Sequence, residues 1–128
     1  MPYISLEIDP LPTQSQATAL ARAITEAMVD IMGKRGAVTA VHISGTPALL
    51  WMVGSEACTQ PTAYVEIKIT KGTNCPDEKA ALIRQVRQSL RETLGDLTEA
   101  SYTVIHEVLA ENWGYDGRTQ RDRQLAQA

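Results

Sequence analysis

The chain has 128 residues, a formal net charge of −3 and 44% hydrophobic residues, enough apolar side chains for one globular core. The acidic balance offers no basic face to a nucleic acid, and no apolar run is long enough to cross a membrane. The two cysteines lack metal-ligand spacing and the first residues lack a signal-peptide pattern. We therefore expect a cytoplasmic protein that uses no metal and no cofactor.

The first predicted strand begins at the start of the chain, where Ile4, Leu6 and Ile8 alternate with polar residues. Pro2 is small enough for the initiator Met1 to be excised before it, which leaves Pro2 with a free secondary amine. An α-amino group has a pKa of about 7.7–8.0, and burial lowers that pKa. An amine that a strand holds in one place suits general base chemistry near neutral pH.

A helix is predicted next, because Thr13 and Gln16 have the spacing of a capping box and apolar residues follow at helical intervals as far as Met32. A second strand is predicted from about Ala37 to Ser44. Beyond it, the sequence predicts a short hairpin from Ala48 to Val53, around Trp51.

The same pattern then starts again. Residues 64–69 match residues 3–8 in character, a second helix is predicted from Pro76 to Gly95, and a last strand runs from about Ser101 to Val108. One constant offset relates the two helices, and it also carries Trp51 onto Trp113.

This repeat predicts an α+β fold in which tandem β-α-β units form a four-stranded mixed sheet with two helices on one face. We expect a single domain over residues 1–128, made of repeats at about 2–56 and 61–117. The remaining tail is polar, and we expect it to be loosely held. The uncovered face of the sheet favours an oligomer.

The Met-Pro start, the repeat and the segment Glu-Asn-Trp-Gly-Tyr-Asp-Gly at 111–117 resemble the tautomerase superfamily. The likeness is to 4-oxalocrotonate tautomerase, with two units fused to give a fold like that of macrophage migration inhibitory factor. The resemblance implies a homotrimer, Pro2 as the catalytic base and Trp113 in the substrate pocket. It also implies a tautomerase that moves a proton between the keto and enol forms of a small 2-oxo acid.

The positions where relatives bind substrate carboxylates with arginines are uncharged in this chain, which has these residues there: Pro12, Ala40, Thr73 or Asn74, and Tyr102. Lys71 is the nearest replacement cation, and Arg35 and Lys34 are the next candidates. Lysine binds a carboxylate as a point charge, without the two-pronged fit of arginine.

Two other functions stay open at this stage. A dehalogenase- or decarboxylase-like relative would need a cation pair and usually an acid, and a binding or structural member with a decayed site would fit the lost arginines. The acid candidates are Glu107 and Asp116, the latter expected to be solvated. His42 and His106 are interpreted as core histidines, and Trp51 as a packing residue or the edge of a second, degenerate pocket.

Overall fold

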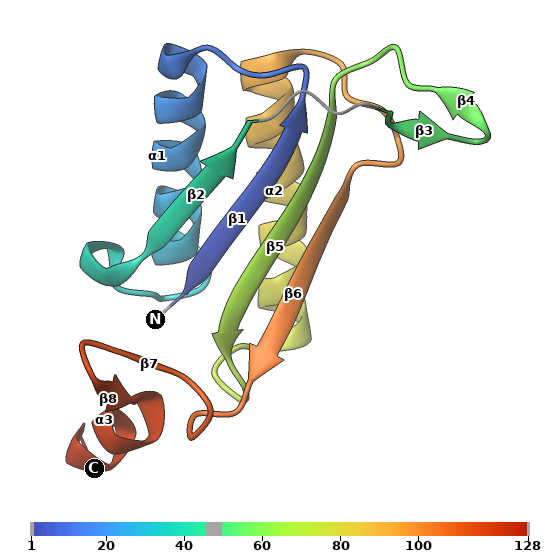
Figure 1. Ribbon diagram of the computed structural model, residues 1–128. Helices are drawn as coiled ribbons and strands as arrows, with labels where there is room; N and C mark the ends of the chain where they lie inside the picture. Colours follow the sequence, from blue (N-terminus) through green and yellow to red (C-terminus); the bar gives the residue numbers. More distant parts are fainter. Residues whose placement is uncertain (1, 46–49, 128) are drawn as a thin grey trace.

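The computed structural model describes residues 2–45 and 50–127 (Figure 1). Its central element is a four-stranded sheet in the order β2-β1-β5-β6, formed by β1 (Tyr3–Asp9), β2 (Ala40–Ser44), β5 (Thr62–Thr70) and β6 (Tyr102–Val108). β1 and β2 are parallel, β5 and β6 are parallel, and β1 and β5 meet antiparallel in the middle. The sheet is therefore mixed, as the sequence predicts.

The two long helices, α1 (Gln14–Asp30) and α2 (Pro76–Leu94), pack side by side on one face of this sheet (Figure 1). The predicted capping box starts α1, since the Gln16 N–H donates to Thr13 Oγ1 at 3.1 Å and the Thr13 N–H donates to Gln16 Oε1 at 2.9 Å. The α+β fold with both helices on one face is confirmed.

Strand alternation sorts the side chains between the two faces of the sheet. Ile4 and Leu6 on β1, and Val65 and Ile67 on β5, are fully buried beneath the helices. Their neighbours along the strands point to the opposite face, which no helix of the described chain covers (Figure 1). This open face carries polar residues from all four strands, among them Ser5, His42, Glu66 and His106.

Two short hairpins follow the second strand of each half. β3 (Met52–Val53) pairs with β4 (Glu56–Ala57), and β7 (Gly114–Tyr115) pairs with β8 (Arg118–Thr119). Each hairpin directly follows a tryptophan, Trp51 or Trp113. The hairpin expected around Trp51 is therefore present, but it begins one residue after the tryptophan; residues 48 and 49 of the prediction lie outside the described residues.

The structure differs from the sequence prediction at two element boundaries. The stretch before β2 is a 3₁₀ turn, η1 (Gly36–Val38), so that β2 starts later than expected. The polar tail is not loosely held, because it forms helix α3 (Gln120–Gln127), whose first residue is buried. None of the described helices combines the length and the apolar character needed to cross a bilayer.

Candidate active site

The strand directions bring the start of the chain next to its C-terminal segment. β1 and β2 begin at one end of the sheet, and β5 and β6, which run in the opposite direction, finish at that same end. The segment after β6 therefore leaves the sheet beside Pro2, and Figure 1 shows the N-terminus on the side of β7 and β8. The Ala40 N–H donates to the Pro2 carbonyl at 3.3 Å, which ties Pro2 to the start of β2.

A cavity of about 510 Å³ opens at this end of the sheet, and we call it the Pro2 pocket. Its lining comes from Pro2 and Tyr3, from residues 37–40, from Lys68 near the end of β5, and from residues 113–115. Pro2 itself is less than 2% exposed. The structure thus brings together two of the site residues predicted from the sequence, Pro2 and Trp113.

Several contacts fix Trp113 and its neighbours in the wall of the Pro2 pocket. The Trp113 indole N–H donates to the buried hydroxyl of Thr70, at 3.1 Å from Nε1 to Oγ1. The β7–β8 turn needs glycine at position 114, because a Cβ there would overlap the Arg118 carbonyl. Helix α3 adds Arg123, whose guanidinium lies 3.8 Å from the centroid of the Tyr115 ring and donates to the Tyr115 carbonyl at 3.0 Å.

Lys68 is the charged residue that the sequence analysis missed. It lies directly opposite Tyr3 in the β1–β5 register, and among the described residues that line the Pro2 pocket it alone carries a full charge. Alternation along β5 could have assigned it to the open face. Its place in the same pocket as Pro2 depends on the β1–β5 pairing register, which cannot be deduced from a single sequence.

The cations predicted from the sequence lie outside the Pro2 pocket of the single chain. Lys71 is exposed in the turn after β5, where its N–H donates to the Val108 carbonyl. Arg35 is exposed and directly precedes η1. Lys34 donates to Thr73 Oγ1 at 2.8 Å, and burial lowers the pKa of its amine, against the opposing effect of Glu78. The substrate contacts expected of Lys71 and Arg35 remain predictions.

The acid candidates also lie away from the pocket lining. Glu107 forms an ion pair with Lys79, at 2.7 Å from Oε1 to Nζ. Hydrogen bonds from Lys79 and from the Gly72 N–H lower the pKa of the Glu107 carboxyl. Asp116 is exposed at the tip of the β7–β8 turn, with a positive φ of 53°.

The interpretation of both histidines as core residues is wrong. His42 and His106 are exposed on the open face of the sheet, because the alternating positions Val41 and Ile105 take the places against the core. His106 lies opposite Lys68 on β6, and its Nε2 is 3.9 Å from a Glu66 carboxylate oxygen.

A mixed sheet of paired β-α-β units, with a buried proline at its amino-terminal edge facing an aromatic segment, is the architecture of tautomerases that the resemblance predicts. A family model described as "Tautomerase enzyme" matches residues 64–123. The chain is also 37% identical over 60 residues to the probable tautomerase K2 of Dickeya dadantii (strain 3937), a match that spans 47% of this chain and 90% of that protein. The chain belongs to the tautomerase family.

Solved structures share the fold over nearly the whole chain. A structure of Pt0534 inactivated by 2-oxo-3-pentynoate has a TM-score of 0.84 at 16% identity, covering 94% of this chain and 98% of that one. A fused 4-OT symmetric trimer has a TM-score of 0.82 at 22% identity, covering 93% and 96%. A macrophage migration inhibitory factor-like protein from Entamoeba histolytica has a TM-score of 0.77 at 19% identity, covering 92% and 97%.

Proposed function

We propose that this protein is a tautomerase that moves a proton between the keto and enol forms of a small 2-oxo acid, with Pro2 as its general base. The observation that carries the proposal is the Pro2 pocket, in which a buried proline, the Trp113 segment and Lys68 line one cavity. Membership of the tautomerase family supports an isomerase-type activity.

Pro2 acts only after Met1 is removed, because an amide nitrogen is not a base. The free secondary amine takes the hydroxyl proton of the enol as the carbonyl forms. The protonated amine then delivers a proton to the substrate carbon, and the base ends in its starting state. An α-amino group ordinarily has a pKa of about 7.7–8.0, so the free amine of Pro2 can exchange a proton near neutral pH.

Lys68 supplies the positive charge that a carboxylate substrate needs. Its position opposite Tyr3 and in the lining of the Pro2 pocket supports this role, in which one end of a short acid is held while the other end reacts at Pro2. The Trp113 ring forms an apolar wall, which lowers the local dielectric and strengthens the attraction between Lys68 and the substrate. We keep Lys71 and Arg35 as further candidates that reach the substrate only from outside this lining.

The first test is the intact mass of the untagged protein. The proposed base exists only if this mass shows that Met1 has been removed. Covalent labelling then locates the base in the sequence. The reagent is 2-oxo-3-pentynoate, which inactivates Pt0534 and is an electrophilic alkyne to which a free amine can add. We expect the reagent mass on the amino-terminal peptide at Pro2.

The matched variant is Pro2→Ala, which keeps an amino terminus at the same place and changes the secondary amine to a primary one. We expect ketonisation of an enolised 2-oxo acid, followed by loss of the enol absorbance, to fall at least about a hundredfold. Equal activity of the two proteins would remove Pro2 from the mechanism. Retained Met1 without ketonisation would instead favour the alternative of a decayed binding protein.

A dehalogenase- or decarboxylase-like reaction ranks lower. Those reactions need a cation pair and usually an acid, whereas Lys68 is the one fully charged group in the described lining of the Pro2 pocket. Turnover of a 3-haloacrylate or a 3-oxo acid, without ketonisation, would reverse this order.

We also propose that the chain is a duplicated unit that works as a homotrimer. The duplication is supported by the common element order of β1-α1-β2 and β5-α2-β6 and by the matching hairpins that follow. The trimer is supported by the open sheet face, which must meet another chain or water, and by a fused 4-OT relative of the same fold that is described as a symmetric trimer.

A further inference from the structure

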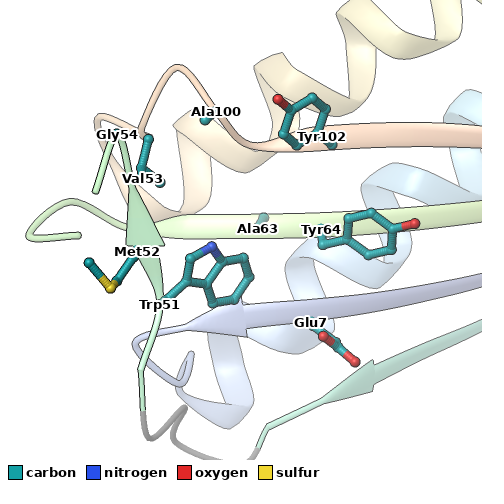
Figure 2. A pocket seen from close by; sticks show the side chains of 9 residues that line it. All are labelled: Glu7, Trp51, Met52, Val53, Gly54, Ala63, Tyr64, Ala100 and Tyr102. Atoms are coloured by element: carbon teal, nitrogen blue, oxygen red, sulfur yellow. The ribbon is translucent and has the colours of Figure 1, made fainter. Parts of the chain in front are cut away.

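A second cavity, of about 430 Å³, lies at the opposite end of the open sheet face and shares no residue with the Pro2 pocket. We call it the Trp51 pocket. Its walls are the side chains of Glu7 on β1, Trp51 before the β3–β4 hairpin, Tyr64 on β5 and Tyr102 on β6. Figure 2 shows the three aromatic rings around the cavity and the Glu7 carboxylate on the side of β1.

The Trp51 pocket occupies the place in one half of the fold that the Pro2 pocket occupies in the other. Trp51 precedes one hairpin as Trp113 precedes the other, at the same spacing. The contacts match as well: the Cys58 N–H donates to the Trp51 carbonyl at 2.9 Å, and the Gln120 N–H donates to the Trp113 carbonyl at 2.9 Å. The two cavities are therefore a matched pair that differ in their chemical groups.

The first difference removes the base. The position that corresponds to Pro2 is Ala63, which lies inside β5 and is 1% exposed. Its nitrogen is an amide that donates to Ser101 Oγ at 3.1 Å. Among the described residues that line the Trp51 pocket, none therefore offers an amine that could transfer protons in the manner proposed for Pro2.

The second difference reverses the charge. Lys68 lies opposite Tyr3 in the Pro2 pocket, whereas Glu7 lies opposite Tyr64 in the Trp51 pocket. These places are equivalent. Tyr3 and Tyr64 hold the same position in their repeats, and the residue opposite each of them in the antiparallel β1–β5 register is Lys68 in one case and Glu7 in the other. A carboxylate ligand that Lys68 attracts would be repelled by Glu7, so the Trp51 pocket selects against the acids that we propose for the Pro2 pocket.

The aromatic walls favour a positive ligand as well. The faces of tryptophan and tyrosine rings attract cations within about 6 Å. The Tyr64 hydroxyl donates to Glu66 Oε1 at 3.0 Å, which places a second carboxylate beside the same wall. This hydrogen bond, then burial, then the charges of Glu66 and Glu7 raise the pKa of Tyr64, consistent with a negative potential at this end of the sheet.

We propose that the Trp51 pocket binds a small organic cation, such as a quaternary ammonium or a protonated amine, with Glu7 as its counter-ion and the rings of Trp51, Tyr64 and Tyr102 as its walls. The cation fits where Glu7 and the rings converge, and the cavity volume admits a group of that size. The proposal goes beyond the tautomerase function and does not depend on it.

Titration calorimetry of the full-length protein with choline tests the proposal, with 3,3-dimethyl-1-butanol as the neutral carbon isostere. We expect choline to bind and the isostere to bind at least about tenfold more weakly. Glu7→Gln and Trp51→Leu should each weaken choline binding by about tenfold or more. The matched variants of the other pocket, Lys68→Gln and Trp113→Leu, should leave it unchanged.

Circular dichroism shows whether each variant is folded, and Tyr102→Leu replaces Trp51→Leu if the latter is not. No choline binding by the wild-type protein would overturn the proposal. Equal binding of the isostere, or choline binding that survives both Glu7→Gln and the loss of an aromatic wall, would also overturn it. Loss of ketonisation in Pro2→Ala has no bearing on these titrations, so the two proposals fail separately.

Discussion

Lys68 lies on β5 directly opposite Tyr3, the residue that follows the proposed base, and it lines the Pro2 pocket. In the proposed function a charge in that place acts on the substrate at short range, and we expect the Trp113 wall to reduce the screening by water once a substrate is bound. Lys71, three residues further along, is exposed like Lys68 but lies in the turn after β5, outside the described lining of the Pro2 pocket, where its backbone N–H donates to the Val108 carbonyl. We therefore expect substitutions of Lys68 and Lys71 to have different effects on substrate binding, although the two residues are close in sequence.

We predict that Lys68→Gln raises the KM for a 2-oxo acid by about tenfold to a hundredfold, because a hydrogen bond to a charged group contributes roughly 1.5–3 kcal/mol. Lys68→Arg keeps the charge and should restore most of the affinity. Steady-state ketonisation kinetics measure both.

Lys71→Gln and Arg35→Gln are the matched controls, because each removes one positive charge outside the described lining of the pocket. We expect each to change KM less than Lys68→Gln does. If Lys71→Gln or Arg35→Gln has the larger effect, the substrate carboxylate binds there and the role assigned to Lys68 is wrong.

At the scale of elements, helix α3 supports the wall of the Pro2 pocket. Arg123 stacks on the Tyr115 ring and bonds its carbonyl, and the Arg121 N–H donates to the Ala110 carbonyl at 2.9 Å. The α3 backbone is thus tied to the segment that carries Trp113. Residues that do not touch the substrate hold the pocket wall in place.

Arg123→Ala should therefore lower kcat/KM by about threefold to thirtyfold, since it removes a stacked guanidinium whose contacts contribute roughly 1–2 kcal/mol. Arg123→Lys should recover little, because lysine lacks the planar group. Arg121→Ala on the same helix is the control: its side chain is 63% exposed and its ion pair to Glu111 spans 3.9 Å, so we expect almost no change. An equal loss in both variants would mean that α3 matters only for overall charge.

A second element-scale prediction concerns the turn between β5 and α2, which Glu107 holds through Lys79 and the Gly72 N–H. These bonds lower the pKa of Glu107, so its carboxylate binds protons less readily in the folded protein than in the unfolded chain. The stabilisation is complete above the unfolded pKa of about 4.3 and is lost as the pH falls through the lower, folded value.

We predict that Glu107→Gln lowers the Tm at neutral pH and reduces the fall in Tm between about pH 5 and pH 3. Scanning calorimetry across that range measures both effects. Glu111→Gln is the control, because Glu111 is 57% exposed and makes only the long contact to Arg121. An unchanged pH profile in Glu107→Gln would show that the ion pair does not stabilise the turn.

Local signals account for the elements that the sequence predicts well. The capping box at Thr13 fixes the start of α1, and alternation along β1 assigns Ile4 and Leu6 to the buried face. Such signals lie within one element and are read directly from residue spacing. Together with the internal repeat and the family resemblance, they led to the mixed sheet with two helices on one face.

The features that the sequence could not predict depend on contacts between distant elements. Lys68 is close to Tyr3 only because of the β1–β5 register. Helix α3 is held by the contact between Arg123 and Tyr115 and not by an apolar face. Its polar sequence therefore could not be distinguished from that of a free tail. His42 is a different case, because alternation along its own strand places Val41 against the core, and this local pattern could have assigned His42 to the open face.

The whole molecule has one sheet face covered by α1 and α2 and one face that is open in the single chain (Figure 1). Val104, half-buried on β6, lies on the open face opposite Glu66. If three chains pack their open faces toward a common centre, as we propose, Val104 becomes buried between chains. Ile83 on the outer side of α2, which is 40% exposed, would stay in solvent.

We therefore predict that the wild-type protein has the mass of a trimer by light scattering at low concentration, and that Val104→Asp reduces this mass. An unpaired charge buried at an interface costs about 3–5 kcal/mol, enough to dissociate a moderately stable assembly. Ile83→Asp introduces the same charge on the helical face and should leave the trimer intact. If relatives complete the pocket with a neighbouring chain, ketonisation falls with the mass in Val104→Asp and not in Ile83→Asp. An active wild-type monomer would contradict both the assembly and the shared pocket, whereas a hexamer would preserve the pocket argument and change only how the trimers stack.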